Sequence, residues 1–192
     1  VLPIAAITKG QQGQALVDFQ GLVEQGVVAF SDDGNALLND YLMSQALLYS
    51  KELSCPIINH AESPSFTNEG QMNAGPLSVS LGLKERPSFA EEIMVARDIS
   101  LASHIGGHLN IAHVSTEGSV QLIRTAKANG INITSEVTPH HVTLTERAIC
   151  NDLTANKISK EFIPNAYNTN AKVAPPLRTP KDVEALIDGV VN

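Results

Sequence analysis

Short apolar runs alternate with longer segments of helical periodicity along this chain. The runs are typical of buried strands and occupy residues 1–8, 27–30, 56–58, 108–112 and 131–137. Apolar residues recur at helical spacing over residues 17–25, 39–53, 88–105, 116–128 and from 179 onward. Parallel neighbouring strands need a crossover connection, which is usually a helix. The pattern therefore predicts an α/β fold whose five strands lie parallel in one sheet.

Local signals mark where some of these helices begin. Ser88 and Glu91 have the spacing of a capping box, which predicts a helix from this point. Thr116 is the predicted N-cap of the next helix, because a threonine oxygen can accept a bond from an unpaired helical N–H group. Two stretches, 63–87 and 150–172, are polar or rich in turn-forming residues and lack a clear period. We expect both stretches to be loops.

Composition and charge exclude several classes of function. The 192 residues carry 20 acidic and 13 basic side chains, for a net charge of −7, and lack a basic cluster. This balance argues against binding of nucleic acid or of an anionic membrane, and the apolar runs are too short to span a bilayer. The two cysteines, Cys55 and Cys150, are too few for a disulfide framework, so we expect a cytoplasmic protein. Its partner is then a small molecule or another protein.

Ligand-type and acid–base side chains follow four successive strands. They are Asp32 and Asp33, His60 with Glu62, His113, and His140 with His141. In a β/α barrel the carboxyl ends of all strands open on one face, where such residues converge. An open doubly wound sheet would spread them along an edge, and no glycine-rich nucleotide motif follows any strand. A barrel mouth fits the pattern better.

Two imidazoles and one carboxylate on adjacent strands form a suitable ligand set for a divalent metal such as Zn²⁺. Glu62 stands two residues after His60, so its carboxylate could orient that imidazole. The same residues also have structural interpretations. Residues 32–34 are typical of a turn, and a histidine at a strand end or in a loop is often only hydrogen-bonded. His104 and His108, which flank a Gly-Gly pair, are expected at the surface.

Longer strings around these residues resemble one enzyme family. They are LPIAAITKG at 2–10, GVVAFSDDG at 26–34, INHAESPS at 58–65, EEIMVARDI at 91–99, IAHVSTEGSVQLIR at 111–124, EVTPHHVTLT at 136–145 and KVAPPLRTPKD at 172–182. The family is that of the dihydroorotases, in their bacterial long-chain class, which are metal-dependent amidohydrolases of pyrimidine synthesis. The combination of EVTPHH with PPLR is highly specific to it.

The resemblance implies a fold, a site and a reaction. The fold is a (β/α)8 TIM barrel, of which this chain would supply about strands 3 to 7 with their helices. Asp33 corresponds to the carboxylate that bridges two metal ions, and His60 and His113 correspond to ligands of the second ion, with one or two Zn²⁺ expected per full-length subunit. The reaction is the reversible cyclisation of N-carbamoyl-L-aspartate to (S)-dihydroorotate. Ala174 stands where the family usually has an asparagine that helps to hold the substrate.

Two family features have no counterpart in residues 1–192. These are the His-x-His pair of the first strand and the acid/base aspartate of the eighth strand, so no catalytic residue is assigned here. We expect the chain to be the central segment of a single barrel domain, inactive by itself. Two alternatives stay open. One is a non-catalytic subunit that partners aspartate transcarbamoylase, and the other is a related cyclic amidohydrolase such as a hydantoinase or allantoinase. A homodimer is a further expected partnership.

Overall fold

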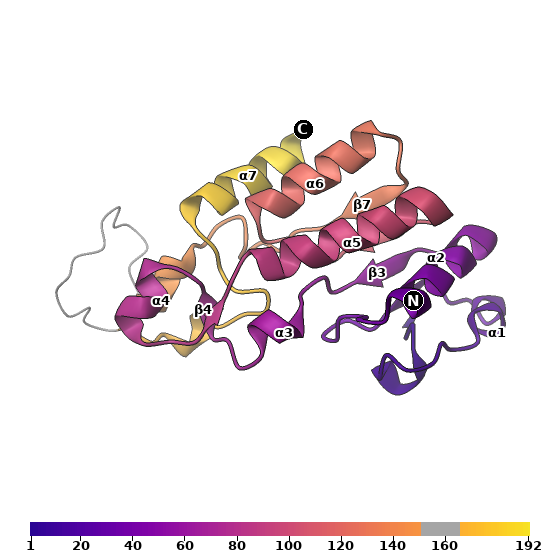
Figure 1. Ribbon diagram of the computed structural model, residues 1–192, viewed down its shortest axis with the longest axis horizontal. Coiled ribbons are helices and arrows are strands. Elements are labelled where there is room, and N and C mark those ends of the chain that lie inside the picture. The colour runs from indigo at the N-terminus through magenta and orange to yellow at the C-terminus, as the bar shows by residue number, and fades with distance from the viewer. Residues whose placement is uncertain (151–165) are drawn as a thin grey trace.

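A parallel sheet forms the centre of the molecule, as the hydrophobic pattern predicts (Figure 1). The computed structural model describes residues 1–150 and 166–192. Within these residues five parallel strands pair in the order β1-β2-β3-β6-β7. Their bounds are Ile4–Ala5 for β1, Ala29–Ser31 for β2, Ile57–Asn59 for β3, Leu109–Ile111 for β6 and Ile133–Ser135 for β7.

The register of the sheet aligns one apolar residue from each of four strands. Phe30 lies opposite Ile57, Ile57 opposite Leu109, and Leu109 opposite Ile133. All four side chains are buried and belong to the main hydrophobic core. Because β3 and β6 are central strands, the segments that leave their carboxyl ends are held firmly beside each other.

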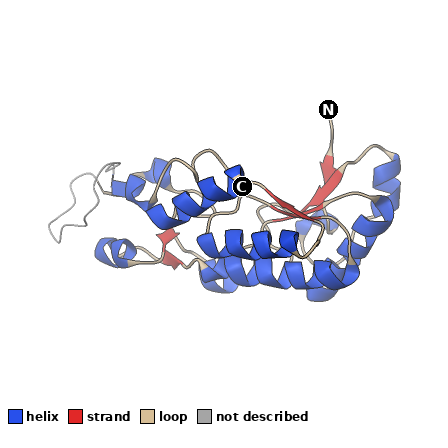
Figure 2. Ribbon diagram, turned by 90° about the horizontal axis from the view of Figure 1, so that it is seen from above, coloured by secondary structure: helices blue, strands red, loops and turns tan. Residues whose placement is uncertain are grey.

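Four helices that connect strands lie beside the sheet, and a fifth helix follows the last described strand (Figure 2). They are α1 at Phe19–Glu24, α2 at Asp40–Leu53, α5 at Phe89–Ile105, α6 at Glu117–Ala128 and α7 at Pro180–Val191. Helix α5 packs between α2 and α6, and α7 packs on the far side of α6. Met43, Leu47 and Val95 are fully buried between helices and sheet. This alternation of strand and covering helix confirms the predicted α/β class.

The helix at Phe89 begins where expected, but the capping-box interpretation of Ser88 and Glu91 is wrong. Ser88 has helical backbone angles, φ −58° and ψ −39°, and its side chain makes no cap bond. The Glu91 carboxylate is buried and accepts hydrogen bonds from the backbone N–H groups of Ser115 and Thr116. The Glu91 carboxylate therefore binds a loop that is distant in sequence and does not cap its own helix. The Thr116 cap is confirmed, since its Oγ1 accepts a bond from the Ser119 N–H.

The stretch at 63–87 is not the loop that its composition predicts. It contains α3 at Pro64–Thr67, β4 at Met72–Asn73, α4 at Pro76–Leu81 and β5 at Glu85–Arg86. Strands β4 and β5 pair in parallel as a second, two-stranded sheet, which lies near α4 at one end of the molecule (Figure 1). Met72, Leu77 and Leu81 form a separate apolar cluster there. These elements are too short to show a hydrophobic period, which is why the sequence pattern misses them.

Short 3-10 helices occupy parts of the remaining connections. They are η1 at Lys9–Gln11, η2 at Glu146–Cys150 and η3 at Thr169–Ala171. Of the predicted loop at 150–172, residues 151–165 lie outside the described residues. No helix in residues 1–150 or 166–192 combines the length and apolar character needed to cross a membrane.

Candidate metal centre

Asp33, His60 and His113 come together at the carboxyl ends of three neighbouring strands. Asp33 follows β2, His60 follows β3 and His113 follows β6. The His60 Nδ1 atom lies 2.9 Å from His113 Nε2 and 3.6 Å from Asp33 Oδ1. His113 Nε2 lies 3.3 Å from the same Asp33 oxygen. The parallel sheet thus brings to one point three potential ligand atoms from residues 27 and 53 positions apart in sequence.

These atoms have the chemistry and spacing that a zinc-sized cation requires. With zinc–nitrogen bonds of about 2.0–2.1 Å, ligand atoms of a tetrahedral site lie roughly 3.3–3.4 Å apart. Of the three observed separations, 3.3 Å lies within this range, 2.9 Å lies below it and 3.6 Å lies above it. Both histidine rings are mostly buried, whereas the Asp33 side chain is 62% exposed. A bound ion would therefore be held from the protein side and be open toward solvent beside Asp33.

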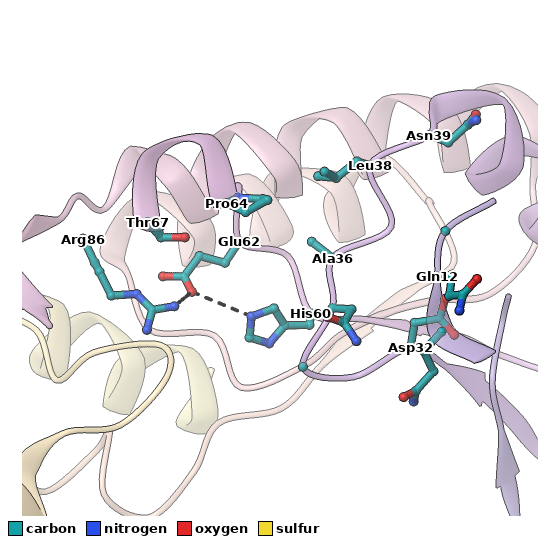
Figure 3. Close-up of a pocket in the computed structure, with 14 residues that line it drawn as sticks. Gln12, Asp32, Ala36, Leu38, Asn39, His60, Glu62, Pro64, Thr67 and Arg86 are labelled. Carbon is teal, nitrogen blue, oxygen red and sulfur yellow. Dashed lines mark hydrogen bonds and ion pairs between the residues drawn. The ribbon is translucent and has the colours of Figure 1, made fainter. Parts of the chain in front are cut away.

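A carboxylate lies on the opposite edge of the His60 ring. Glu62 Oε2 is 3.7 Å from His60 Nε2, and Glu62 is also hydrogen-bonded to Arg86 (Figure 3). Burial raises the pKa of Glu62, but the bond from His60 and the charges of Arg86 and Arg178 outweigh it, so that the net pKa is lowered. An ionised carboxylate here favours a proton on Nε2. The lone pair of Nδ1 then points to Asp33 and His113.

The backbone of His113 is strained. Its φ angle is +35°, a left-handed value that residues with a side chain rarely adopt and that costs about 1–3 kcal/mol. The Nδ1 atom of the same ring is buried without a hydrogen-bond partner among the described residues. This conformation aims Nε2 at the other two side chains. Sequence inspection carries no signal for it, because nothing in the AHVS string requires a positive φ angle.

A cavity of about 570 Å³ opens beside His60 (Figure 3). Its walls include the polar side chains of Gln12, Asn39 and Arg86. The polar lining and the neighbouring ligand cluster suit a small polar molecule. Ala174, the position predicted to contact substrate, is exposed and does not line this cavity.

Asp32 has a structural role that its neighbour Asp33 does not share. It is 3% exposed, and its carboxylate accepts bonds from the backbone N–H groups of Ile7 and Thr8 and from the Thr8 hydroxyl. It therefore ties the segment after β1 to the end of β2. Of the two acids in the SDDG string, only Asp33 faces the histidines.

The His140-His141 pair does not join the ligand cluster. His141 is buried, with Nδ1 2.8 Å from the Thr138 hydroxyl and Nε2 3.1 Å from the Pro175 carbonyl oxygen. This histidine therefore fixes the segment that leads into α7. The surface expectation holds for His104, which is exposed, whereas His108 is half-buried and contacts Thr134.

Comparison with known proteins identifies the family. Residues 1–119 match the family described as dihydro-orotase-like. The chain belongs to this family. It is 47% identical over 190 residues to the dihydroorotase of Caldanaerobacter subterraneus subsp. tengcongensis, covering 99% of this chain and 41% of that protein. It is 45% identical over 192 residues to the dihydroorotase of Pelotomaculum thermopropionicum, covering 100% of this chain and 42% of that protein. The chain thus spans about two fifths of the length of these relatives.

Solved structures support the same fold. A D-hydantoinase from Bacillus sp. AR9 superposes with a TM-score of 0.71 at 20% identity, over 97% of this chain and 39% of that chain. An L-hydantoinase from Arthrobacter aurescens gives a TM-score of 0.70 at 17% identity, over 96% of this chain and 39% of that chain. At this identity the likeness concerns the fold alone. It confirms that the parallel sheet and its helices form part of a β/α barrel.

The sequence pattern does not predict that two arginines lie beside the cluster. Arg86 contacts Glu62, and Arg178 lies fully buried behind it. Arg178 is part of the PPLR string, but a string match assigns it no contact. Arg86 falls in the stretch that the sequence pattern predicts to be a loop. Their contacts join parts of the chain that are distant in sequence, so only the structure reveals them.

Proposed function

We propose that this chain is the central segment of the barrel domain of a metal-dependent dihydroorotase, which interconverts N-carbamoyl-L-aspartate and (S)-dihydroorotate in pyrimidine biosynthesis. The observation that carries the proposal is the convergence of Asp33, His60 and His113 on one point. These residues occur in a chain that is 47% identical to a curated dihydroorotase over 190 residues. Family membership alone would not distinguish a working site from a lost one, whereas three converging ligand atoms argue for a working site.

Zinc is the metal that we propose, with one or two ions in the full-length subunit. Asp33 Oδ1, His60 Nδ1 and His113 Nε2 would hold one ion, and the family resemblance makes Asp33 the ligand that two ions would share. When bound, zinc activates water at neutral pH and polarises an amide carbonyl, which suits opening and closing of a cyclic amide. Glu62 orients the His60 ring, and the neighbouring cavity offers polar groups to a small substrate.

The proposal extends to surroundings and partners. We propose a cytoplasmic location, because two cysteines in 192 residues are too few for a disulfide framework. We propose a small-molecule substrate, since the net charge of −7 argues against nucleic acid or an anionic membrane as the partner. A second copy of the chain and aspartate transcarbamoylase are the protein partners that we propose to test.

The test measures hydrolysis of dihydroorotate by the purified full-length protein, with hydantoin and allantoin as competing substrates. We expect activity on dihydroorotate that is lost after chelation and restored by Zn²⁺. His113→Asn should reduce activity by more than the roughly 10–100-fold cost of losing an outer partner of a metal ligand. His104→Asn, at an exposed histidine on α5, is the matched control and should leave activity unchanged. Faster turnover of hydantoin or allantoin would instead favour a related cyclic amidohydrolase.

A non-catalytic subunit is the second candidate, and Ala174 is the observation that favours it. An alanine lacks the polar group with which the usual asparagine would hold the substrate. Ala174→Asn in the full-length protein should lower KM for dihydroorotate if the enzyme works with a weakened contact. Absence of activity in both forms, together with a stable complex with aspartate transcarbamoylase in size-exclusion chromatography, would establish the structural role.

A further inference from the structure

A buried guanidinium group lies between the two loops that carry the histidines of the cluster. Arg178 is 1% exposed and precedes α7 in the chain. His60 and Glu62 follow β3, and His113 and Ser115 follow β6. Arg178 reaches toward both of these loops. Neither the sequence pattern nor the family match assigns it this place.

On the β6 side, Arg178 holds the loop that carries His113. Its Nε–H donates to the Ser115 Oγ at 3.1 Å, and the Ser115 hydroxyl in turn donates to the Glu91 carboxylate. Glu91 also accepts the Ser115 backbone N–H at 3.1 Å. Ser115 stands two residues beyond His113, whose backbone is in a strained conformation. Bonds that hold Ser115 from two directions help to maintain that strain.

On the β3 side, Arg178 faces the carboxylate that orients His60. Its Nη2 atom is 4.0 Å from Glu62 Oε1. Both atoms are buried, and neither has a hydrogen-bond partner among the described residues. The other Glu62 oxygen lies 3.7 Å from His60 Nε2. Arg178 therefore lies against the side of Glu62 that faces away from the ring and limits where this carboxylate can move.

The second sheet fixes the orientation of the guanidinium plane. Nη1 donates to the Asn73 Oδ1 on β4 at 2.9 Å and to the backbone oxygen of Arg86 on β5 at 2.7 Å. The three nitrogens of Arg178 thus address three different parts of the molecule. A planar fork with five N–H donors can do this, whereas a lysine ammonium cannot cover the same directions at once.

We infer that Arg178 is a positioning residue that sets the geometry of the metal centre by holding the His60 and His113 loops at a fixed separation. The inference rests on the metal centre of the proposed function and is independent of which cyclic amide the protein acts on. Arg178 does not touch the ligand atoms, so its effect passes through Ser115 and Glu62.

The test measures metal affinity of the purified full-length protein, by competition for Zn²⁺ with a chromophoric chelator. Arg178→Lys and Arg178→Met should each bind Zn²⁺ about 10–100-fold more weakly than wild type, the usual cost of losing an outer partner of metal ligands. The visible spectrum of the Co²⁺-loaded variants should also change, because it reports ligand geometry. Arg124→Met, which removes an exposed ion pair with Asp188, is the matched control and should leave both measurements unchanged.

A further control must show that lower stability alone does not weaken Zn²⁺ binding. Leu47→Ala removes a fully buried core side chain of α2, outside the ligand cluster, so it should lower the melting temperature while leaving Zn²⁺ affinity unchanged. If the Arg178 variants do not fold, Ser115→Ala provides the decision, since it removes the Nε acceptor and the hydroxyl bond to Glu91 but keeps Arg178 and the backbone bond from Ser115 to Glu91. We expect about tenfold weaker Zn²⁺ binding for it, at the lower end of the same range.

Several results would overturn the inference. Wild-type affinity in Arg178→Met or in a folded Arg178→Lys would do so, because the planar fork would then be dispensable. Wild-type affinity in Ser115→Ala, where Arg178 cannot be replaced, would have the same meaning, as would an equal loss of affinity in Leu47→Ala. Weaker metal binding in the variants, with no dihydroorotate hydrolysis by wild type, would uphold the inference and refute the proposed activity.

Discussion

Acid should destabilise this protein through His141, a histidine outside the ligand cluster. Burial is the main cause of its lowered pKa, about 4 against an ordinary value of 6.5, and the nearby His140, His113 and Arg178 act in the same direction. The hydrogen bond to the Pro175 carbonyl opposes the shift but does not cancel it. The folded protein therefore keeps this imidazole neutral at pH values where the unfolded chain binds a proton.

The size of the effect follows from the two pKa values. Because the folded-state pKa is the lower one, the contribution of His141 to stability is intact above about pH 7 and is lost as pH falls through 6.5 toward 4. Linkage with pKa values of 6.5 and about 4 gives a loss of about 2 kcal/mol between pH 7 and pH 5. The loss reaches about 3 kcal/mol at pH 4.

Urea unfolding of wild type and His141→Gln at pH 7 and pH 5 measures this loss. Glutamine does not titrate in this range, and its side-chain N–H can still donate to Pro175. The free energy of unfolding of wild type should fall by about 2 kcal/mol more than that of the variant between the two pH values. Equal falls in both proteins would refute the reasoning, as would an NMR titration of His141 with a midpoint near 6.5.

Two further changes test how helices contact the loops on either side of β6. Glu91→Ala leaves the backbone N–H groups of Ser115 and Thr116 buried without their acceptor, which should cost about 2–6 kcal/mol in urea unfolding, and a cost under about 1 kcal/mol would show that the carboxylate is dispensable. Gly107→Ala should cost more stability in thermal unfolding than Gly130→Ala. Both positions have positive φ angles, but at Gly107 the added Cβ would overlap a backbone oxygen of α2, whereas at Gly130 it meets open space; equal costs would contradict this distinction.

Much of the fold is predictable because apolar runs and helical periods are local properties. The strand at Ile57–Asn59 and the helix at Asp40–Leu53 lie where their periodicity places them. The α3-to-β5 region is not predictable in this way, since elements of two to six residues are too short to show a period. The capping-box prediction for Glu91 is wrong for a related reason. Its spacing from Ser88 is a local signal, whereas its bonds go to a loop 24 and 25 residues away.

In the candidate site, too, local sequence features predict some residues and miss those that act through long-range contacts. The positions of Asp33, His60 and His113 after parallel strands predict that they lie close together, because the carboxyl ends of such strands meet at one edge. The same argument also includes Asp32 and His141, which bond elsewhere, and only the family resemblance singles out the three as ligands. Their supporting residues were not predictable. Arg178 reaches Ser115 and Asn73 across 63 and 105 positions of the chain, and no periodicity reports such contacts.

Anomalous X-ray scattering at the zinc absorption edge, from crystals of the full-length protein grown with Zn²⁺, tests the central claim most directly. The account predicts a zinc peak bonded to Asp33 Oδ1, His60 Nδ1 and His113 Nε2. A map without a peak among these three atoms, or with the His113 ring turned away from them, would contradict it.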